Sequence, residues 1–123
     1  IVNADIKDAQ AAQIKSYTFS NIKNWVYSSP FNVPNSNPLY INLRQWSTSS
    51  DYTPYTIEYT VFTHTPTGTP KMSSYSSSVY NYSGPAVYAQ MSGAPVQDNQ
   101  ATLHITIKKG DQAYSGYGEI YQN

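Results

Sequence analysis

Apolar and polar residues alternate along most of the chain from Tyr17 onward, and this two-residue period is typical of half-buried β-strands. In residues 101–108 the apolar side chains fall on odd positions and the polar ones on even positions. The clearest strands are predicted at 39–46, 55–65 and 101–109, with weaker ones near 71–80 and 86–91. The turn Lys109-Gly110-Asp111 predicts that 112–121 returns antiparallel to the strand before it.

Pro and Gly separate these short strands, and no alternation of strands with helices is visible, which favours an antiparallel β-sandwich. Residues 28–38 hold three prolines and three asparagines, so this stretch is predicted to be an ordered loop rather than a strand. The fold class predicted for residues 17–123 is therefore all-β.

The first sixteen residues have a different pattern and predict a short N-terminal α-helix. Good helix formers carry acidic residues near the start and lysines later, the polarity that a helix dipole favours. The apolar side of this helix would consist of Val2, Ile6, Ala9, Ile14 and Tyr17. A lone helix of this length is marginal in water, so it needs a surface from its own domain or from a second copy.

Length and charge narrow the range of partners. The chain has 123 residues, enough for one domain, and seven Lys and Arg balance seven Asp and Glu. This balance argues against nucleic acid and against anionic membranes, and no apolar run approaches the roughly 18 residues of a membrane span. The absence of Cys excludes disulfides, a thiolate nucleophile and a Cys-type zinc site.

Catalysis finds little support in the sequence. The two histidines, His64 and His104, are predicted on solvent-facing sides of strands or at strand ends, and none of the common catalytic or metal-binding motifs is present. Gly116-Tyr117-Gly118 lacks the context of a nucleotide-binding loop. We therefore expect no enzyme activity, no metal and no cofactor.

Thirteen tyrosines against three phenylalanines indicate a recognition surface, because Tyr combines an apolar ring with a hydroxyl that tolerates water. Sugars are bound by aromatic faces and by planar polar side chains. The loop and the segment after the first clear strand supply candidates of both kinds: Phe31, Asn32, Trp46, Asp51 and Tyr55. The alternative for any single aromatic residue is that it fills the sandwich core.

The segments VYSSP at 26–30, YINLRQW at 40–46 and YTIEYTV at 55–61, with a polar Asn/Pro loop between the first two, resemble the fungal immunomodulatory proteins. Residues 102–107 and the closing IYQN are also similar to that family in spacing and residue class. The resemblance implies an immunoglobulin- or fibronectin-III-like sandwich over residues 17–123. It also implies a homodimer built through residues 1–16, with the helix stripe as the contact.

The implied activity is lectin-like: binding of cell-surface glycans and glycoproteins, and stimulation of immune cells, without catalysis. By position, the family's sugar-site Asp becomes Asn42, its C-terminal Trp becomes Tyr121, and its loop Trp becomes Asn32, with Phe31 beside it. These changes leave the sugar specificity open. The chain keeps the family's lack of Cys but contains His and Met.

A second interpretation is a secreted microbial effector or elicitor that binds a host protein through the sandwich surface. Both interpretations place the protein outside the cell, where the sequon Asn81-Tyr82-Ser83 would be open to glycosylation. Simple sugars should block the lectin's binding and leave the effector's binding unchanged.

Overall fold

The computed structural model describes residues 11–48, 53–79, 84 and 86–123, and these residues form nine β-strands and no helix. The strands are β1 (Ala12–Ile22), β2 (Trp25–Tyr27), β3 (Phe31–Val33), β4 (Leu39–Ser47), β5 (Tyr55–Thr63), β6 (Lys71–Val79), β7 (Val87–Gln90), β8 (Asp98–Lys109) and β9 (Tyr114–Gln122). Every pairing between these strands is antiparallel. The predicted all-β class is therefore confirmed over the described residues.

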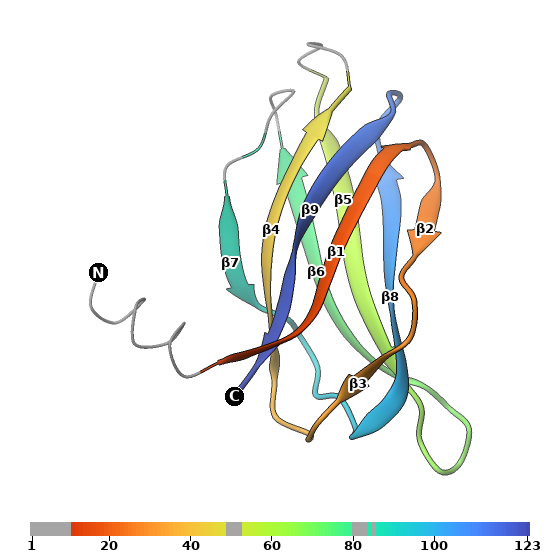
Figure 1. The fold of residues 1–123 in the computed structure, drawn as a ribbon. Coiled ribbons are helices and arrows are strands. Elements are labelled where there is room, and N and C mark those ends of the chain that lie inside the picture. The colour runs from red at the N-terminus through yellow and green to blue at the C-terminus, as the bar shows by residue number, and fades with distance from the viewer. Residues whose placement is uncertain (1–10, 49–52, 80–83, 85) are drawn as a thin grey trace.

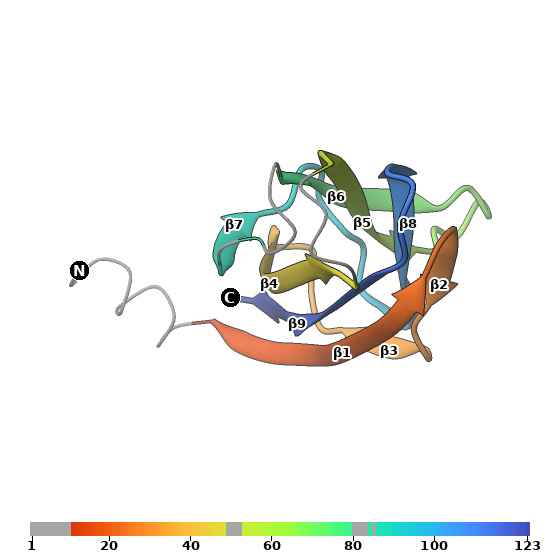
Figure 2. The same ribbon diagram turned by 90° about the horizontal axis from the view of Figure 1, so that it is seen from above.

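Two sheets pack face to face as a sandwich (Figure 1). One sheet has the order β1-β9-β4-β7, and the other has the order β2-β8-β5-β6 with β3 also paired to β8. Seen from above, the sheets form two layers, with β1, β9 and β4 on one side and β8, β5 and β6 on the other (Figure 2). The antiparallel sandwich predicted from the strand pattern is confirmed.

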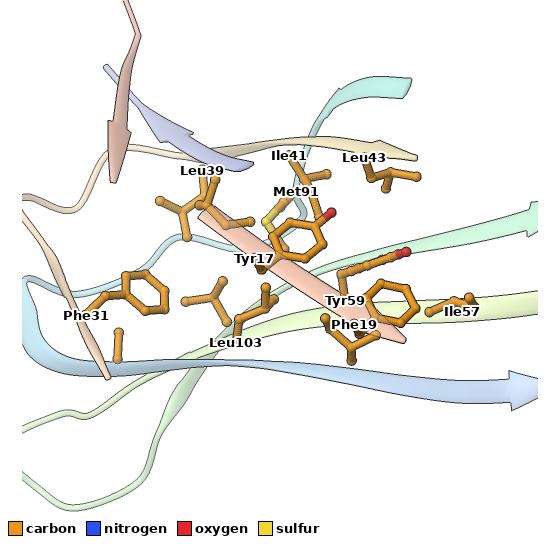
Figure 3. Packing of buried hydrophobic residues seen from close by; sticks show 14 of the residues in the cluster. Tyr17, Phe19, Phe31, Leu39, Ile41, Leu43, Ile57, Tyr59, Met91 and Leu103 are labelled. Atoms are coloured by element: carbon orange, nitrogen blue, oxygen red, sulfur yellow. The ribbon is translucent and has the colours of Figure 1, made fainter. Parts of the chain in front are cut away.

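The core lies between the layers and is built from the inward positions of each strand. In β4, and in β5 except at the buried Thr60, these positions alternate with more exposed ones, as the two-residue period of a strand requires. Figure 3 shows Tyr17, Tyr59 and Leu103 meeting aliphatic side chains from β4 in this interior. Removing each such side chain from water contributes roughly 1.5–3 kcal/mol to folding.

The predicted strands at 39–46, 55–65, 71–80, 86–91, 101–109 and 112–121 correspond to β4, β5, β6, β7, β8 and β9, within three residues at each end. Position 80 lies outside the described residues, so the end of the fourth prediction is not compared. These strands share regular alternation or strong β-formers, which made them visible in the sequence.

The N-terminal helix prediction is wrong where the structure can be compared with it. Residues 12–16 belong to β1, which runs on to Ile22 and crosses the expected boundary between residues 16 and 17. Tyr17 is a buried core residue and Ile14 packs against the same core, so neither lies on a helical stripe. Pairing with β9 supplies the backbone hydrogen bonds that a short helix would have made alone. Val2, Ile6 and Ala9 lie outside the described residues.

The loop predicted at 28–38 is interrupted by a strand, which is a second correction. Phe31–Val33 forms β3 and pairs with β8, with Phe31 and Val33 buried and Asn32 exposed between them. Three residues between two prolines are too few to show the two-residue period of a strand, and the surrounding Pro and Asn residues are typical of a loop. The short β2 was missed for the same reason.

Candidate ligand-binding face

The outer surface of the β1-β9-β4-β7 sheet gathers polar and aromatic side chains into rows. Alternation along β4 and β9 directs every second side chain away from the core, and the two strands are paired residue for residue. The β4–β9 face consists of these rows: Tyr40 beside Tyr121, Asn42 beside Glu119 and flanked by Tyr88 of β7, Arg44 beside Tyr117, and then Trp46.

Aromatic rings occupy both ends of the β4–β9 face. At one end the Tyr40 and Tyr88 rings are parallel, with centroids 5.8 Å apart, and Tyr88 meets the edge of Tyr121 at 5.9 Å. At the other end Trp46 and Tyr117 make an edge contact at 6.0 Å. Such pairs hold each other in position, so the rings are arranged before any ligand arrives.

Planar polar groups lie between the two aromatic ends. The Asn42 amide donates a 2.9 Å hydrogen bond from Nδ2 to Oε1 of Glu119, which lies directly opposite it across the strand pair. Arg44 is exposed in the next row. One amide, one carboxylate and one guanidinium offer both donors and acceptors in fixed planes, which suits the paired hydroxyls of a sugar.

A shallow cavity of about 200 Å³ opens in this polar centre. Its lining consists of Asn42, Leu43, Arg44, Ala86, Tyr117, Gly118 and Glu119. Gly118 pairs with Leu43 of β4 and lies between the outward-facing Tyr117 and Glu119 of β9, which border the cavity. The cavity therefore joins the polar centre to the Trp46 and Tyr117 end of the face.

Three of the residues predicted from the sequence come together on this face: Asn42, Trp46 and Tyr121. Asn42 supplies the central amide, while Trp46 and Tyr121 belong to opposite aromatic ends. All three are partly exposed, which leaves their side chains within reach of a ligand.

Two predicted sugar-binding residues are instead part of the core. Phe31 is 8% exposed and Tyr55 is 1% exposed, so neither ring can present a face to a ligand. Figure 3 shows Phe31 at the end of the interior cluster. Tyr55 stacks on Tyr114 at 4.4 Å, and burial, with a smaller effect from Tyr114, raises the pKa of Tyr55 to about 12. Both side chains occupy inward positions of strands. These positions, and not the polar residues beside them in the sequence, decide that the two rings are buried.

Of the remaining two candidates, Asn32 is separated from the face. Asn32 is exposed and lines a different open hollow together with His64, Pro66, Gln97, Asp98 and Asn99. Asp51 lies outside the described residues. The structure therefore does not join Asn32 to Asn42 and Tyr121 in one site.

Five residues of the β4–β9 face were missed by sequence reasoning: Tyr40, Arg44, Tyr88, Tyr117 and Glu119. The alternation of β4 and β9 would have placed four of them on the same faces as Asn42 and Tyr121 once the strands were aligned. The pairing of β7 with β4, which adds Tyr88, has no comparable signal in the sequence.

A second aromatic group lies on the outer surface of the other sheet. We call it the β2–β8 column, and it consists of Trp25, Tyr27, His104 and Phe62, in ring contact in that order with centroid separations of 4.6, 3.7 and 4.3 Å. The first two contacts are stacked, and the third is tilted. Trp25 and Tyr27 are among the most exposed large apolar side chains described, at 58% and 53%. Trp25 and Tyr27 alternate with the partly buried Val26, but three residues are too few to predict a strand from the sequence.

The two histidines occupy different surroundings. His104 is half-buried in the β2–β8 column, its Nε2 lies 3.1 Å from Oγ1 of Thr102, and desolvation lowers its pKa. His64 is exposed, and its backbone N–H donates to the Asp98 carboxylate. Among the residues that the structure describes, no group of three or more His, Asp or Glu could hold a metal ion. Nor does this part of the chain contain a helix of the length and apolarity needed to cross a membrane.

No protein-family model matches this sequence, and no curated protein gives a significant match to it. The similarity to the fungal immunomodulatory proteins therefore stays a prediction.

Proposed function

We propose that the protein is a non-enzymatic, lectin-like domain that binds neutral glycans on the β4–β9 face. The observation that supports this proposal most directly is the placement of two aromatic pairs on either side of the Asn42–Glu119 hydrogen bond. Rings at both ends and planar polar groups between them match the alternation of C–H surfaces and hydroxyls on a sugar chain.

The binding mode follows from the chemistry of each part. Tyr117 is 48% exposed and offers a ring for stacking, with Trp46 supporting it from the edge. The Glu119 carboxylate accepts hydrogen bonds from sugar hydroxyls, the Asn42 amide both donates and accepts, and Arg44 adds donors beside them. Asn42 and Glu119 bond to each other before a ligand binds, so little ordering is required on binding.

The test is a glycan array of neutral sugars, followed by titration of the best ligand. Tyr117→Ala and Asn42→Ala should each weaken binding about fivefold or more, since each removes roughly 1–3 kcal/mol of contact. Tyr27→Ala is the matched control, because Tyr27 is similarly exposed at 53% but lies on the opposite sheet. Absence of binding to every neutral glycan, or equal affinities for all three variants, would reject the proposal.

The wider family assignment belongs to the same proposal. A secreted fungal immunomodulatory protein with a fibronectin-III-like sandwich would bind glycans on immune cells and stimulate them. Cell stimulation that disappears with Tyr117→Ala and survives Tyr27→Ala would support this assignment. Stimulation that is unaffected by both variants would separate immune activity from the β4–β9 face.

A homodimer through the N-terminal segment is a further part of this proposal. The truncation that tests it must stop at residue 10, because β1 begins at Ala12 and deletion beyond it would remove sheet pairing with β9. Removal of residues 1–10 should halve the mass measured by light scattering. An unchanged mass would show that the dimer, if present, uses another surface.

The β2–β8 column favours the second candidate, binding to a host protein. Exposed Trp and Tyr side chains are enriched in the energetic centres of protein interfaces, and the exposed Met72 follows Phe62 at the far end of the column. Binding to cells that resists competition by simple sugars and disappears with Trp25→Ala would favour this candidate over the lectin.

A further inference from the structure

A separate pocket of about 270 Å³ lies at the open edge of the sandwich, where β1 faces β2. Its lining consists of Lys15, Ser16, Tyr17, Thr18, Val26, Tyr27, Ser28, Ser29 and Ile105. Lys15 is the one charged residue among them, and none of them is acidic. The pocket shares no residue with the β4–β9 face, so an inference about it is independent of the function proposed above.

Strand parity directs Lys15 toward this edge. Lys15 lies two residues before the inward-facing Tyr17, and the pairing with β9 shifts by one residue between Gln13 and Lys15. The Lys15 side chain therefore points toward the inner side of β1, and at this end of the strand it meets only the edge of the other sheet. Its ammonium reaches that edge, donating from Nζ to Oγ of Ser29 at 2.6 Å and lying 5.7 Å from the centre of the Phe31 ring.

These two contacts hold the ammonium without neutralising it. An ammonium has three N–H donors and Ser29 occupies one, so two remain for a ligand. Neither the Ser29 hydroxyl nor the Phe31 ring carries a formal charge. Lys15 is also partly buried, and an ion pair formed at such a position is stronger than one in open water.

The pocket walls are fixed by contacts of their own. Ser28 is clamped to β8: its backbone N–H donates to the Leu103 carbonyl at 2.8 Å, and its Oγ accepts from the Leu103 N–H at 2.9 Å. Tyr27 is held in the β2–β8 column between its stacking contacts with His104 and Trp25. A ligand would thus meet a preformed site, with serine hydroxyls on one side and an aromatic wall on the other.

The size and chemistry of the pocket select one class of ligand. Its volume is slightly below the roughly 300–1,000 Å³ of pockets that take drug-sized molecules, so it accommodates about one sugar ring. A single cation without a neighbouring acid attracts one anionic group, while the hydroxyls and the apolar Val26 and Ile105 suit a polyhydroxy ring. We propose that this pocket binds the carboxylate-bearing sugar of an acidic glycan, with Lys15 pairing the carboxylate.

The experiment is a titration of the full chain followed by ¹H–¹⁵N NMR, with matched acidic and neutral probes. The probes are sialyllactose against lactose and glucuronic acid against glucose, so that sialic and uronic acids are told apart. The acidic member of at least one pair should shift the amides of Ser16, Thr18 and Ser28, while its neutral partner leaves them unchanged. Lys15→Gln should weaken acidic-sugar binding about tenfold or more, and Lys15→Arg should retain most of it.

Two control variants make the outcome specific. Lys71→Gln removes an exposed lysine from β6 and should leave the affinity unchanged. Arg44→Gln tests whether the acidic sugar uses the β4–β9 face instead. The proposal is overturned if neither acidic sugar binds, if acidic and neutral probes bind equally, if Lys15→Gln binds as the unmodified protein does, or if Arg44→Gln alone abolishes binding. Binding of neutral glycans that depends on Tyr117 tests the proposed function separately, so either idea can fail without the other.

Discussion

Tyr17 and Gly118 lie directly opposite each other in the β1–β9 pair, and the tyrosine occupies the space that a side chain at position 118 would need. A Cβ on Gly118 would lie 2.6 Å from the Tyr17 hydroxyl, which itself donates to the Asn42 carbonyl at 3.3 Å. Phe19 lies over Gly116 in the same way. The Gly-Tyr-Gly sequence is therefore a packing motif that seats two rings inside and leaves Tyr117 outside.

Gly118→Ala should destabilise the protein by about 1–3 kcal/mol, because the added methyl group forces apart Tyr17 and the backbone of Asn42. Urea unfolding measures the change in the free energy of unfolding. Ser20→Ala, at an exposed position of the same β1 strand, serves as the control and should stay within about 0.5 kcal/mol. Equal stability of the two variants would show that the contact between Gly118 and Tyr17 leaves room for a methyl group.

Tyr59→Phe should cost about 1–3 kcal/mol, since it leaves a buried acceptor without its donor. The Tyr59 hydroxyl donates to Oε1 of Gln45 at 2.7 Å, and both residues are fully buried. Gln45→Leu should also destabilise, but the double variant should cost less than the two single changes added together. A double-mutant cycle by urea unfolding measures this coupling, and simple additivity would contradict it.

Stability should fall as the pH rises above about 10. Burial raises the pKa values of Tyr17, Tyr55 and Tyr59, that of Tyr55 to about 12, whereas a phenol in the unfolded chain ionises near pH 10. Between these values the unfolded state binds fewer protons, so alkali favours unfolding. Thermal unfolding followed against pH should show a shallower alkaline decline for Tyr55→Phe. An identical decline would show that Tyr55 does not contribute to the loss of stability at alkaline pH.

Stability should also fall as the pH drops below about 6.5, through His104. Desolvation lowers the pKa of His104 in the folded state, so the unfolded chain takes up its proton first and acid favours unfolding. The loss should stop once the pH is below the folded-state pKa. His104→Phe keeps a ring between Tyr27 and Phe62 and should flatten this part of the stability profile. A profile with the same slope as the unmodified protein would contradict the assignment.

The binding candidates show how far sequence reasoning reached. Asn42 and Tyr121 were placed by resemblance and lie in adjacent rows of one face, because β4 and β9 are paired in register. Tyr55 has the same side chain as Tyr121 but occupies an inward position, and Phe31 is buried as well, so strand parity decides which aromatic candidates reach the surface. No sequence pattern marks Lys15 as a binding residue, because its surroundings depend on where β1 meets the edge of the other sheet in the folded protein.

The sequence by itself determined the class of fold, because regular alternation in the clearest strands suffices to specify strands with one buried side. Only the tertiary structure decided the fate of residues 12–16, which are helix-forming locally but gain hydrogen bonds and burial from β9. It also decided which tyrosines remain at the surface. Local preferences are worth tenths of a kcal/mol per residue, whereas the partner strand and the opposite sheet contribute several, so contacts between distant segments prevail.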